Sequence, residues 1–205
     1  MTSACKVCLD CRVVSAPVVL KKYGIETIYT VNVKSKRLSG KYDEFVINYS
    51  SALGVDLKEN DLVNIDGELR SINVKTGDSK FMLRLYVLAN NIKYLDSEPD
   101  NYTNIVEING GKMNRKTDFR KSDKSEDTVI QNINIKVERF NKSFVIPCSC
   151  WNNNAKIIKN LPIGTRLNVR GRLQSHRTSS NYLMIEVPLN LISIYNEEKG
   201  DTEEE

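Results

Sequence analysis

The sequence predicts an all-β fold of two tandem five-stranded barrels, each with a short helix after its third strand. Two observations lead to this prediction: the second half of the chain repeats the first, and segments with alternating apolar and polar residues dominate both halves. Alternation with a period of two is typical of strands that are buried on one face. At 205 residues, the chain is long enough for two domains with separate cores.

The repeat is clearest in one strand of each half. Residues 63–71 match residues 167–175, and each segment carries a glycine, Gly67 or Gly171, at the same place. Weaker matches on both sides occur in the same order at slowly changing spacing, which indicates a duplicated domain with insertions in its loops. The resulting division is a first domain at residues 9–96, a polar linker at 97–101, a second domain at 102–196 and a disordered acidic tail at 197–205.

Alternation is strongest in residues 27–34 and in the matching residues 131–137. The apolar positions that we expect on the core side of these two strands are Tyr29, Val31, Val33, Ile133, Ile135 and Val137. Further strands are expected at residues 44–50, 61–73, 79–94, 143–151, 166–176 and 182–195. The strands at 61–73 and 79–94 should form a hairpin that turns at residues 75–78.

A helical pattern follows the third strand of each half. It covers residues 50–58 in the first half and residues 152–160 in the second, where Ala155, Ile157 and Ile158 are expected to pack inward. Five strands with a helix in this place are the arrangement of an oligonucleotide-binding (OB) barrel, whose open sheet face and loops bind single strands or sugars. The glycines within the repeated strands would mark a bend or bulge of such a barrel.

Charge is distributed unevenly along the chain. The formal net charge of +4 combines +3 in residues 12–96, +8 in residues 101–196 and −7 in the remaining pieces, which include the acidic end. A basic body is typical of proteins that bind polyanions, and a detached acidic tail often serves as a docking arm or as a competitor for the basic surface. A solvated surface with a solubilising tail is the alternative interpretation of the same charges.

Cysteine and histidine usage excludes several classes of protein. Five cysteines are too few and too clustered for a disulfide framework, so we expect a reducing compartment. Cys5 and Cys8 have the spacing of zinc ligands, but a structural zinc site needs four ligands, and we expect free thiols and no metal. With His176 as the only histidine, no Gly-rich phosphate loop and scattered acids, we expect no enzyme and no cofactor. No stretch approaches the roughly 20 apolar residues of a membrane span, and we expect a cytoplasmic protein.

The second half resembles the OB domain of the bacterial and phage single-stranded DNA-binding proteins. The segments that carry the resemblance are residues 105–110, 117–120, 148–151, Ala155 and 164–173. The first half keeps the same skeleton more faintly, and Ala52 stands near the place of the family's stacking aromatic. In this family an acidic tail often ends in a hydrophobic tip that docks partner enzymes, whereas this tail ends in three glutamates. Phe144 lies one residue before a position that is aromatic in many relatives, which Val145 occupies here.

The resemblance implies a base-stacking role for Trp151 and a place for Arg139 at the end of the second strand. The charged loop of residues 112–127 and the last hairpin add cations and rings, which are the two groups that single-strand binding requires. Burial in a core is the alternative for Trp151, and simple solvation is the alternative for the loop. The candidate DNA-binding residues are Trp151, Arg139, Arg172, Arg170, Arg120, Arg115, Lys116, Phe119, His176, Arg177, Tyr182, Arg37, Lys34 and Arg70.

The sequence therefore predicts a non-enzymatic protein that binds and protects single-stranded DNA, without strong sequence preference, during DNA replication, recombination or repair. Because relatives with one OB domain per chain assemble as tetramers, a duplicated chain would reach four domains as a homodimer. Replication or recombination proteins are possible further partners. The alternatives are a primosomal or RNA-binding OB protein, an OB scaffold for protein interaction, and a nuclease, which would need clustered acids for a metal.

Overall fold

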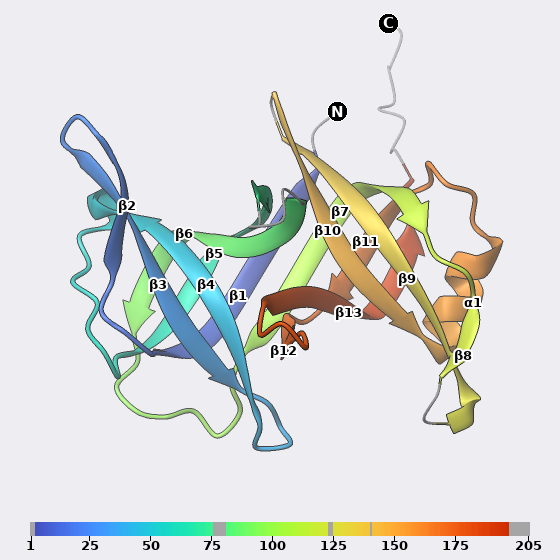
Figure 1. The fold of residues 1–205 in the computed structure, drawn as a ribbon, viewed down its shortest axis with the longest axis horizontal. Coiled ribbons are helices and arrows are strands. Elements are labelled where there is room, and N and C mark those ends of the chain that lie inside the picture. Colours follow the sequence, from blue (N-terminus) through green and yellow to red (C-terminus); the bar gives the residue numbers. More distant parts are fainter. Residues whose placement is uncertain (1–2, 76–80, 123–124, 140, 197–205) are drawn as a thin grey trace, which may run out of the picture.

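Strands dominate the computed structural model, which describes residues 3–75, 81–122, 125–139 and 141–196 (Figure 1). The predicted all-β class is confirmed. The tip of the hairpin expected at residues 75–78 and the expected acidic tail at 197–205 lie outside the described residues, apart from Lys75. None of the described helices is long and apolar enough to cross a membrane.

Strand pairing in the first half closes into a ring. Its elements are β1 (Ala4–Val13), β2 (Val18–Tyr23), β3 (Glu26–Lys36), β4 (Tyr42–Ser50), the 3-10 helix η1 (Ser51–Leu53), β5 (Leu62–Lys75) and β6 (Phe81–Tyr94). β1 pairs with both β3 and β5, β3 pairs with β4, and β5 pairs with β6, all antiparallel. A short parallel pairing between β4 and β6 completes the ring, and β2 adds a hairpin on β3.

The second half repeats this ring. Its elements are β7 (Asn104–Lys116), β8 (Arg120–Ser122), β9 (Ser125–Arg139), β10 (Lys142–Trp151), α1 (Asn152–Asn160), β11 (Arg166–Gly171), β12 (Gln174–Arg177) and β13 (Leu183–Ile194). β7 pairs with β9 and β11, β9 pairs with β10, and β11 pairs with β13. Again one parallel pairing, between β10 and β13, closes the ring. The strand predicted at 166–176 is broken in two, and β12 leaves the ring to form a hairpin with β13.

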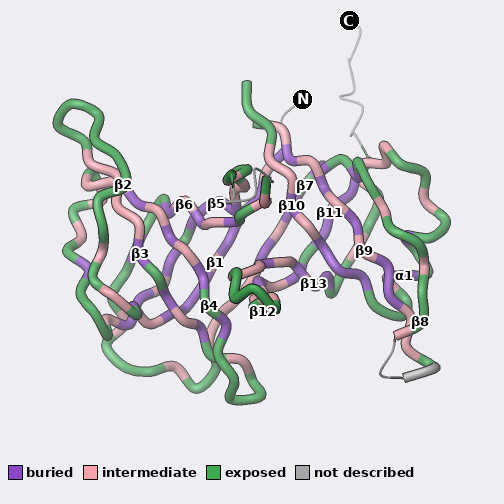
Figure 2. Tube along the Cα trace, in the orientation of Figure 1, coloured by how far each residue is buried: buried purple, intermediate pink, exposed green. Residues whose placement is uncertain are grey.

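The alternating apolar residues form the core of each ring, as Figure 2 shows by the regular buried positions along the strands. Val31, Val33, Ile133, Ile135 and Val137 are buried and Tyr29 is half-buried, which confirms the predicted core faces. Their partners across the sheets, among them Phe45 and Ile146, are buried as well.

The two predicted helices differ in outcome. α1 forms at residues 152–160, with Ala155 and Ile158 buried, but Ile157 is 37% exposed, so its predicted inward placement is wrong. Residues three apart share a helix face, whereas Ile157 is turned away from it. In the first half only η1 forms, because Gly54 takes a left-handed conformation (φ 67°) that ends it.

Both repeated glycines lie at register shifts of their strands, at Asp66/Gly67 and at Arg170/Gly171, as the predicted bulges require. A Cβ atom on Gly171 would lie 2.3 Å from the carbonyl oxygen of Pro188, and one on Gly67 would lie 2.5 Å from that of Leu88. Both obstacles are backbone atoms of the neighbouring strand, so no side-chain rotation relieves the overlap.

Replacing Gly171 with alanine is therefore expected to lower the free energy of unfolding by about 3 kcal/mol, the upper end of overpacking costs. Urea denaturation followed by circular dichroism measures the change. Lys22→Ala, at an exposed position of β2 in the first ring, is the control and should change stability by about 0.5 kcal/mol or less. Equal stability of the Gly171→Ala variant and the wild type would show that β11 and β13 can separate freely.

The two rings are joined by an antiparallel pairing of β1 with β7, in which Val7 lies opposite Val106. This pairing produces one continuous sheet in the order β6-β5-β1-β7-β11-β13. In Figure 1 the β12–β13 hairpin reaches from the second ring to β4, and β5 reaches from the first ring to β10. Each ring thus contributes a hairpin that contacts the surface of the other ring.

Candidate nucleic-acid interface

β9 and β10 each have one side that faces the core of the second ring and one side that faces away from it, and the side facing away is the outer face of β9 and β10. Alternate residues point to opposite sides of a strand, so Asn132 and Asn134 face outward while Ile133 and Ile135 face the core. On β10 their cross-strand partners are Ser149, which is buried, and the half-buried Pro147. This face is therefore lined by amide groups in the middle of the second ring.

Trp151 ends the same face. It is the last residue of β10 and the N-cap of α1, with an extended backbone (φ −118°, ψ 146°), and it lies opposite Ile130 of β9. The side chain is 43% exposed, so the alternative of a core tryptophan does not apply. The flat ring is accessible where the strand stops and the helix begins.

A pocket of about 270 Å³ crosses the outer face from β7 to β13. Its polar lining residues are Arg115, Thr117, Asn132, Asn134 and Glu186. Arg115 pairs with Asn134 across the β7–β9 ladder and is exposed. Among these residues the sequence predicted Arg115 alone, although the alternation of residues 131–137 also indicated an available face.

The remaining loop candidates lie beside α1. The Lys116 ammonium donates hydrogen bonds to the carbonyl oxygens of Lys159 (3.0 Å) and Leu161 (2.7 Å), so it stabilises the C-terminal end of the helix. The ring of Phe119 lies under the Lys159 ammonium, 4.8 Å from the centroid. Arg120 is exposed on β8 and pairs with Ile130, which also pairs with Trp151. Arg120 and Trp151 therefore flank the same position of β9.

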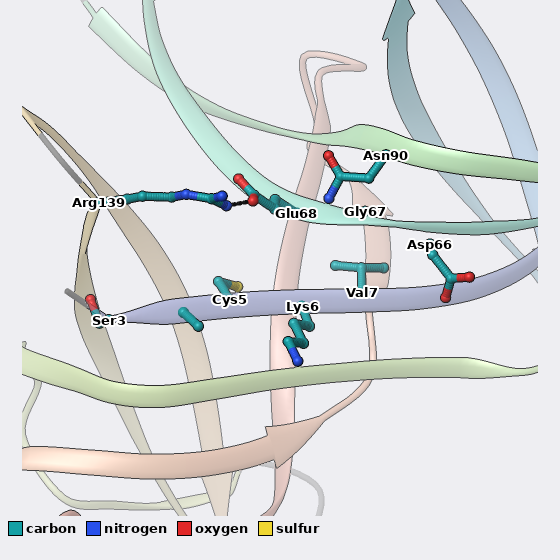
Figure 3. Close-up of a pocket in the computed structure, with 10 residues that line it drawn as sticks. Ser3, Cys5, Lys6, Val7, Asp66, Gly67, Glu68, Asn90 and Arg139 are labelled. Carbon is teal, nitrogen blue, oxygen red and sulfur yellow. Dashed lines mark ion pairs between the residues drawn. The ribbon is translucent and has the colours of Figure 1, made fainter. Parts of the chain in front are cut away.

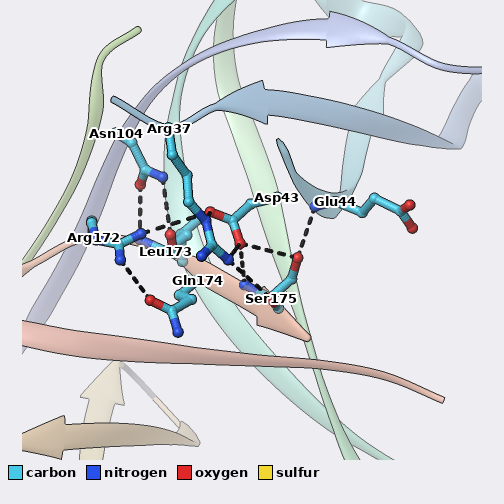
Figure 4. Close-up of polar contacts among 8 residues, drawn as sticks. All are labelled: Arg37, Asp43, Glu44, Asn104, Arg172, Leu173, Gln174 and Ser175. Carbon is cyan, nitrogen blue, oxygen red and sulfur yellow. Dashed lines mark hydrogen bonds and ion pairs between the residues drawn. The ribbon is translucent and has the colours of Figure 1, made fainter. Parts of the chain in front are cut away.

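Arg37 and Arg172 meet at a buried carboxylate between the two rings (Figure 4). Asp43 is fully buried and accepts two hydrogen bonds from Arg37, at 2.6 and 2.5 Å, and Arg172 lies 3.7 Å away. The backbone N–H of Ser175 donates to Asp43 at 2.7 Å, and the Ser175 hydroxyl accepts from the N–H of Glu44 at 2.8 Å. The carboxylate raises the pKa of Arg37 above its ordinary value. Arg172 therefore links the rings through Asp43, and Arg37 links them by donating a hydrogen bond to the carbonyl oxygen of Ser175 (3.3 Å).

Arg70 and Arg139 meet at a second carboxylate, that of Glu68. Figure 3 shows the ion pair from Arg139 to Glu68, and the Arg70 guanidinium lies 2.9 Å from the same group. Arg70 also covers the ring of Phe144, 5.4 Å from its centroid. Arg70, Arg139, Phe144 and Lys142 line an open pocket of about 310 Å³, so cations from both rings converge there.

Tyr182 and Arg177 lie in a groove of about 470 Å³ between the β12–β13 hairpin and the first ring. Arg177 forms an ion pair with Glu44, and Tyr182 is 39% exposed. Arg84 of β6 also lines this groove, a cation that the sequence did not single out. The groove therefore combines an accessible ring with charge from both halves.

The other three candidate residues do not line any of the three pockets described above. His176 is exposed on β12. The Lys34 ammonium lies over the ring of Tyr42 at 5.2 Å from its centroid. Arg170 lies 3.6 Å from Glu107 on the sheet shared by β7 and β11, away from the outer face of β9 and β10.

The cysteines show no arrangement for a metal. Cys5 and Cys8 are three residues apart on β1, so their side chains point to opposite faces. Burial raises the pKa of the Cys5 thiol to about 12. The part of the chain that the structure describes contains no group of three or more His, Cys, Asp or Glu side chains that would hold a metal ion.

Neither a protein-family model nor a curated protein matches this sequence. Among solved structures, wild-type single-stranded DNA binding protein from Thermus aquaticus is similar with a TM-score of 0.75 and 19% identity, covering 96% of this chain and 95% of that chain. A deletion mutant of the Thermus aquaticus protein gives 0.75 and 18%, covering 98% and 99%. The N-terminal domain of PriB from Thermoanaerobacter tencongensis covers 45% of this chain and 97% of its own, at 28% identity and a TM-score of 0.39. The resemblance seen in the sequence is confirmed for the fold: this chain has the fold of Thermus aquaticus single-stranded DNA binding protein over almost its whole length.

Proposed function

We propose that this protein binds and protects single-stranded DNA, without enzymatic activity, while strands are unpaired in replication, recombination or repair. The observation that carries the proposal is the half-exposed Trp151 at the end of an outer sheet face that also presents amides and Arg115. The fold shared with a protein named as a single-stranded DNA binding protein supports it.

Binding would combine stacking with charge. An unpaired base that stacks on an aromatic side chain contributes about 1–3 kcal/mol, and the contribution depends little on which base it is. Trp151 offers such a ring on the second barrel, and Tyr182 offers another in the groove next to the first. Arg115 and Arg120 would contact phosphates, while Arg37 and Arg172 position the two barrels through Asp43.

The proposal includes the organisation of the chain and its partners. It assigns two OB domains at residues 9–96 and 102–196 and a homodimer with four such domains in a cytoplasmic setting. Replication or recombination proteins would be further partners. The pairing of β1 with β7 joins the two rings of strands within one chain, which supports the dimer as the route to four.

A competition experiment tests this function against its alternatives. A fluorescently labelled dT oligonucleotide is bound to the full chain, and unlabelled single strand, matched duplex and RNA of the same length compete. We expect competition by the single strand, weaker competition by RNA and little by duplex. Stronger competition by RNA would establish the RNA-binding alternative, and no binding even at low salt would favour a module for protein interaction.

Arg115→Ala is expected to lower the affinity for single-stranded DNA and to reduce the slope of log affinity against log salt concentration by about 0.7, the value for one lost phosphate contact. Arg170→Ala is the comparison, because that side chain pairs with Glu107 on another sheet. Titrations at several salt concentrations measure both slopes. An equal reduction in the two variants would contradict the assignment of the outer face of β9 and β10.

A further inference from the structure

The two contacts between the rings share one backbone hydrogen-bond pattern. The hydroxyl of Ser175 on β12 accepts the N–H of Glu44 on β4 at 2.8 Å. The hydroxyl of Ser71 on β5, the counterpart of Ser175 in the repeat, accepts the N–H of Val145 on β10 at 2.9 Å. Since β4 and β10 each close their own ring through a parallel pairing, the two contacts occupy equivalent places in the duplicated fold.

The residue that precedes the donated N–H differs between the two contacts. At the first contact this residue is Asp43, whose buried carboxylate pairs with two arginines (Figure 4). At the second contact it is Phe144, whose half-buried ring lies under the Arg70 guanidinium. A hydrocarbon ring carries no charge, so the second contact lacks the carboxylate that occupies this position in the first.

The open pocket of about 310 Å³ at the second contact, here called the junction pocket, is basic. Its lining residues are Arg70 from the first ring and Arg139, Asn141, Lys142 and Phe144 from the second. Three of these described residues are cations and none is an acid. Glu68 beside the pocket pairs with both arginines. Among the described residues, no carboxylate lies within ion-pair distance of Lys142, so its charge is available to a ligand.

The junction pocket and Trp151 lie at opposite ends of β10. Lys142 is the first residue of this strand and pairs with Arg139, the last residue of β9, whereas Trp151 is the last residue of β10. A strand of 10 residues, at about 3.3 Å for each, is about 30 Å long. A ligand that contacts both places must therefore be a long polymer.

We propose that the junction pocket binds a phosphate group of the single strand that stacks on Trp151, through Lys142 and the two arginines. Phosphate oxygens accept strong charge-assisted hydrogen bonds, and an arginine can present two parallel donors to them. A phosphate contact carries no sequence information, so the pocket agrees with binding that lacks a strong sequence preference. The inference rests on the proposed function and adds to it a second contact region, formed by both rings.

Charge reversal at Lys142 tests the proposal, and the same reversal at Lys41 is the matched control. Both lysines are exposed, and each lies three residues before the N–H donor of its contact. Lys41, however, belongs to the contact at which Asp43 supplies a carboxylate. Lys142→Glu and Lys41→Glu change the net charge equally, so a difference between them is local. Lys142→Ala removes the cation without adding an acid, and thermal melting checks that every variant is folded.

Titrations at several salt concentrations use a dT oligonucleotide of about 30 nucleotides, longer than the roughly 16 that one OB barrel covers at most. We expect Lys142→Ala to reduce the slope of log affinity against log salt concentration by about 0.7, the value for one lost phosphate contact. Lys142→Glu should bind still more weakly at low salt, and Lys41→Glu should keep the wild-type slope. Quenching of Trp151 at saturation should be the same in every variant, because the ring lies at the other end of β10.

Three outcomes would contradict these expectations. An unchanged slope in Lys142→Ala, or equal losses in Lys142→Glu and Lys41→Glu, would overturn the proposal. If Lys142→Glu lost binding of a poly-glutamate peptide but bound DNA as the wild type does, the pocket would belong to an acidic protein segment, and the proposal would again be overturned. Absence of DNA binding by the wild type would instead overturn the proposed function, and the phosphate contact with it.

Discussion

Asp43→Asn is expected to lower the free energy of unfolding by about 3 kcal/mol, because it leaves partly buried arginines without their carboxylate. Asp43 is fully buried and receives Arg37, the Ser175 N–H and the charge of Arg172. An asparagine of nearly the same size accepts fewer hydrogen bonds and presents an amino group to two cations. The contact between β4 of the first ring and β12 of the second should weaken as a result.

Guanidinium denaturation measures this loss, with Glu44→Gln as the control. Glu44 is the next residue of β4 and also pairs with an arginine of the second ring, Arg177, but this ion pair is exposed. Exposed pairs contribute about 0 to 1 kcal/mol, so the control should remain close to the wild type. Equal losses in the two variants would contradict a structural role for the buried carboxylate.

Trp151→Ala is expected to weaken the binding of single-stranded DNA by about 1–3 kcal/mol, or roughly 5- to 150-fold, which is the contribution of one stacked base. The ring is 43% exposed, so the variant should fold. Fluorescence anisotropy with a labelled dT oligonucleotide measures the change in affinity.

Two further variants show whether stacking is the cause. Trp151→Phe keeps a flat ring and should recover most of the affinity. Tyr94→Ala removes a ring that is 49% exposed on β6 in the first half, away from the outer face of β9 and β10, and should bind almost as the wild type does. If Tyr94→Ala lost as much affinity for single-stranded DNA as Trp151→Ala, exposed aromatic rings would contribute to binding wherever they lie, and the assignment of Trp151 to a specific site would be contradicted.

The repeat and the alternation of apolar residues predicted most of the long strands, because burial on one face imposes a period of two on the sequence. The short strands β2 and β8 were not predicted, and the strand expected at residues 166–176 is divided into β11 and β12. The bulges at Gly67 and Gly171 were predicted because a glycine within a strand is typical of a bulge, and the structure adds the physical reason: a Cβ at either position meets the backbone of the neighbouring strand. It failed for Ile157, because a short apolar run in a helix does not reveal which residues share its buried face.

The sequence did not predict which residues of the first half contact residues of the second half. Arg37 and Arg172 carry the charge that phosphate contacts require, but the pattern gave no sign that β12 would bring Ser175 against Asp43. The place of Glu186 beside the pocket with Arg115 was likewise not predicted, because it depends on which strands surround the pocket. The stacking role of Trp151, in contrast, was implied by the family resemblance with core burial as the alternative, and the structure shows the residue 43% exposed.

The two contacts between the rings use opposite charges at matching positions of the repeat. Arg172 follows Gly171 and meets Asp43, whereas Glu68 follows Gly67 and meets Arg139. Each ring therefore presents a charge that complements the other ring rather than a copy of itself.

Intrinsic tryptophan fluorescence during titration with a dT oligonucleotide tests the central claim most directly, because Trp151 is the sole tryptophan of the chain. The account predicts strong quenching by the single strand and none by a matched duplex, with log affinity falling against log salt concentration by about 0.7 for each phosphate contacted. Binding of the single strand without any change in fluorescence would contradict the placement of Trp151 in the site. No binding at low salt would contradict the function itself.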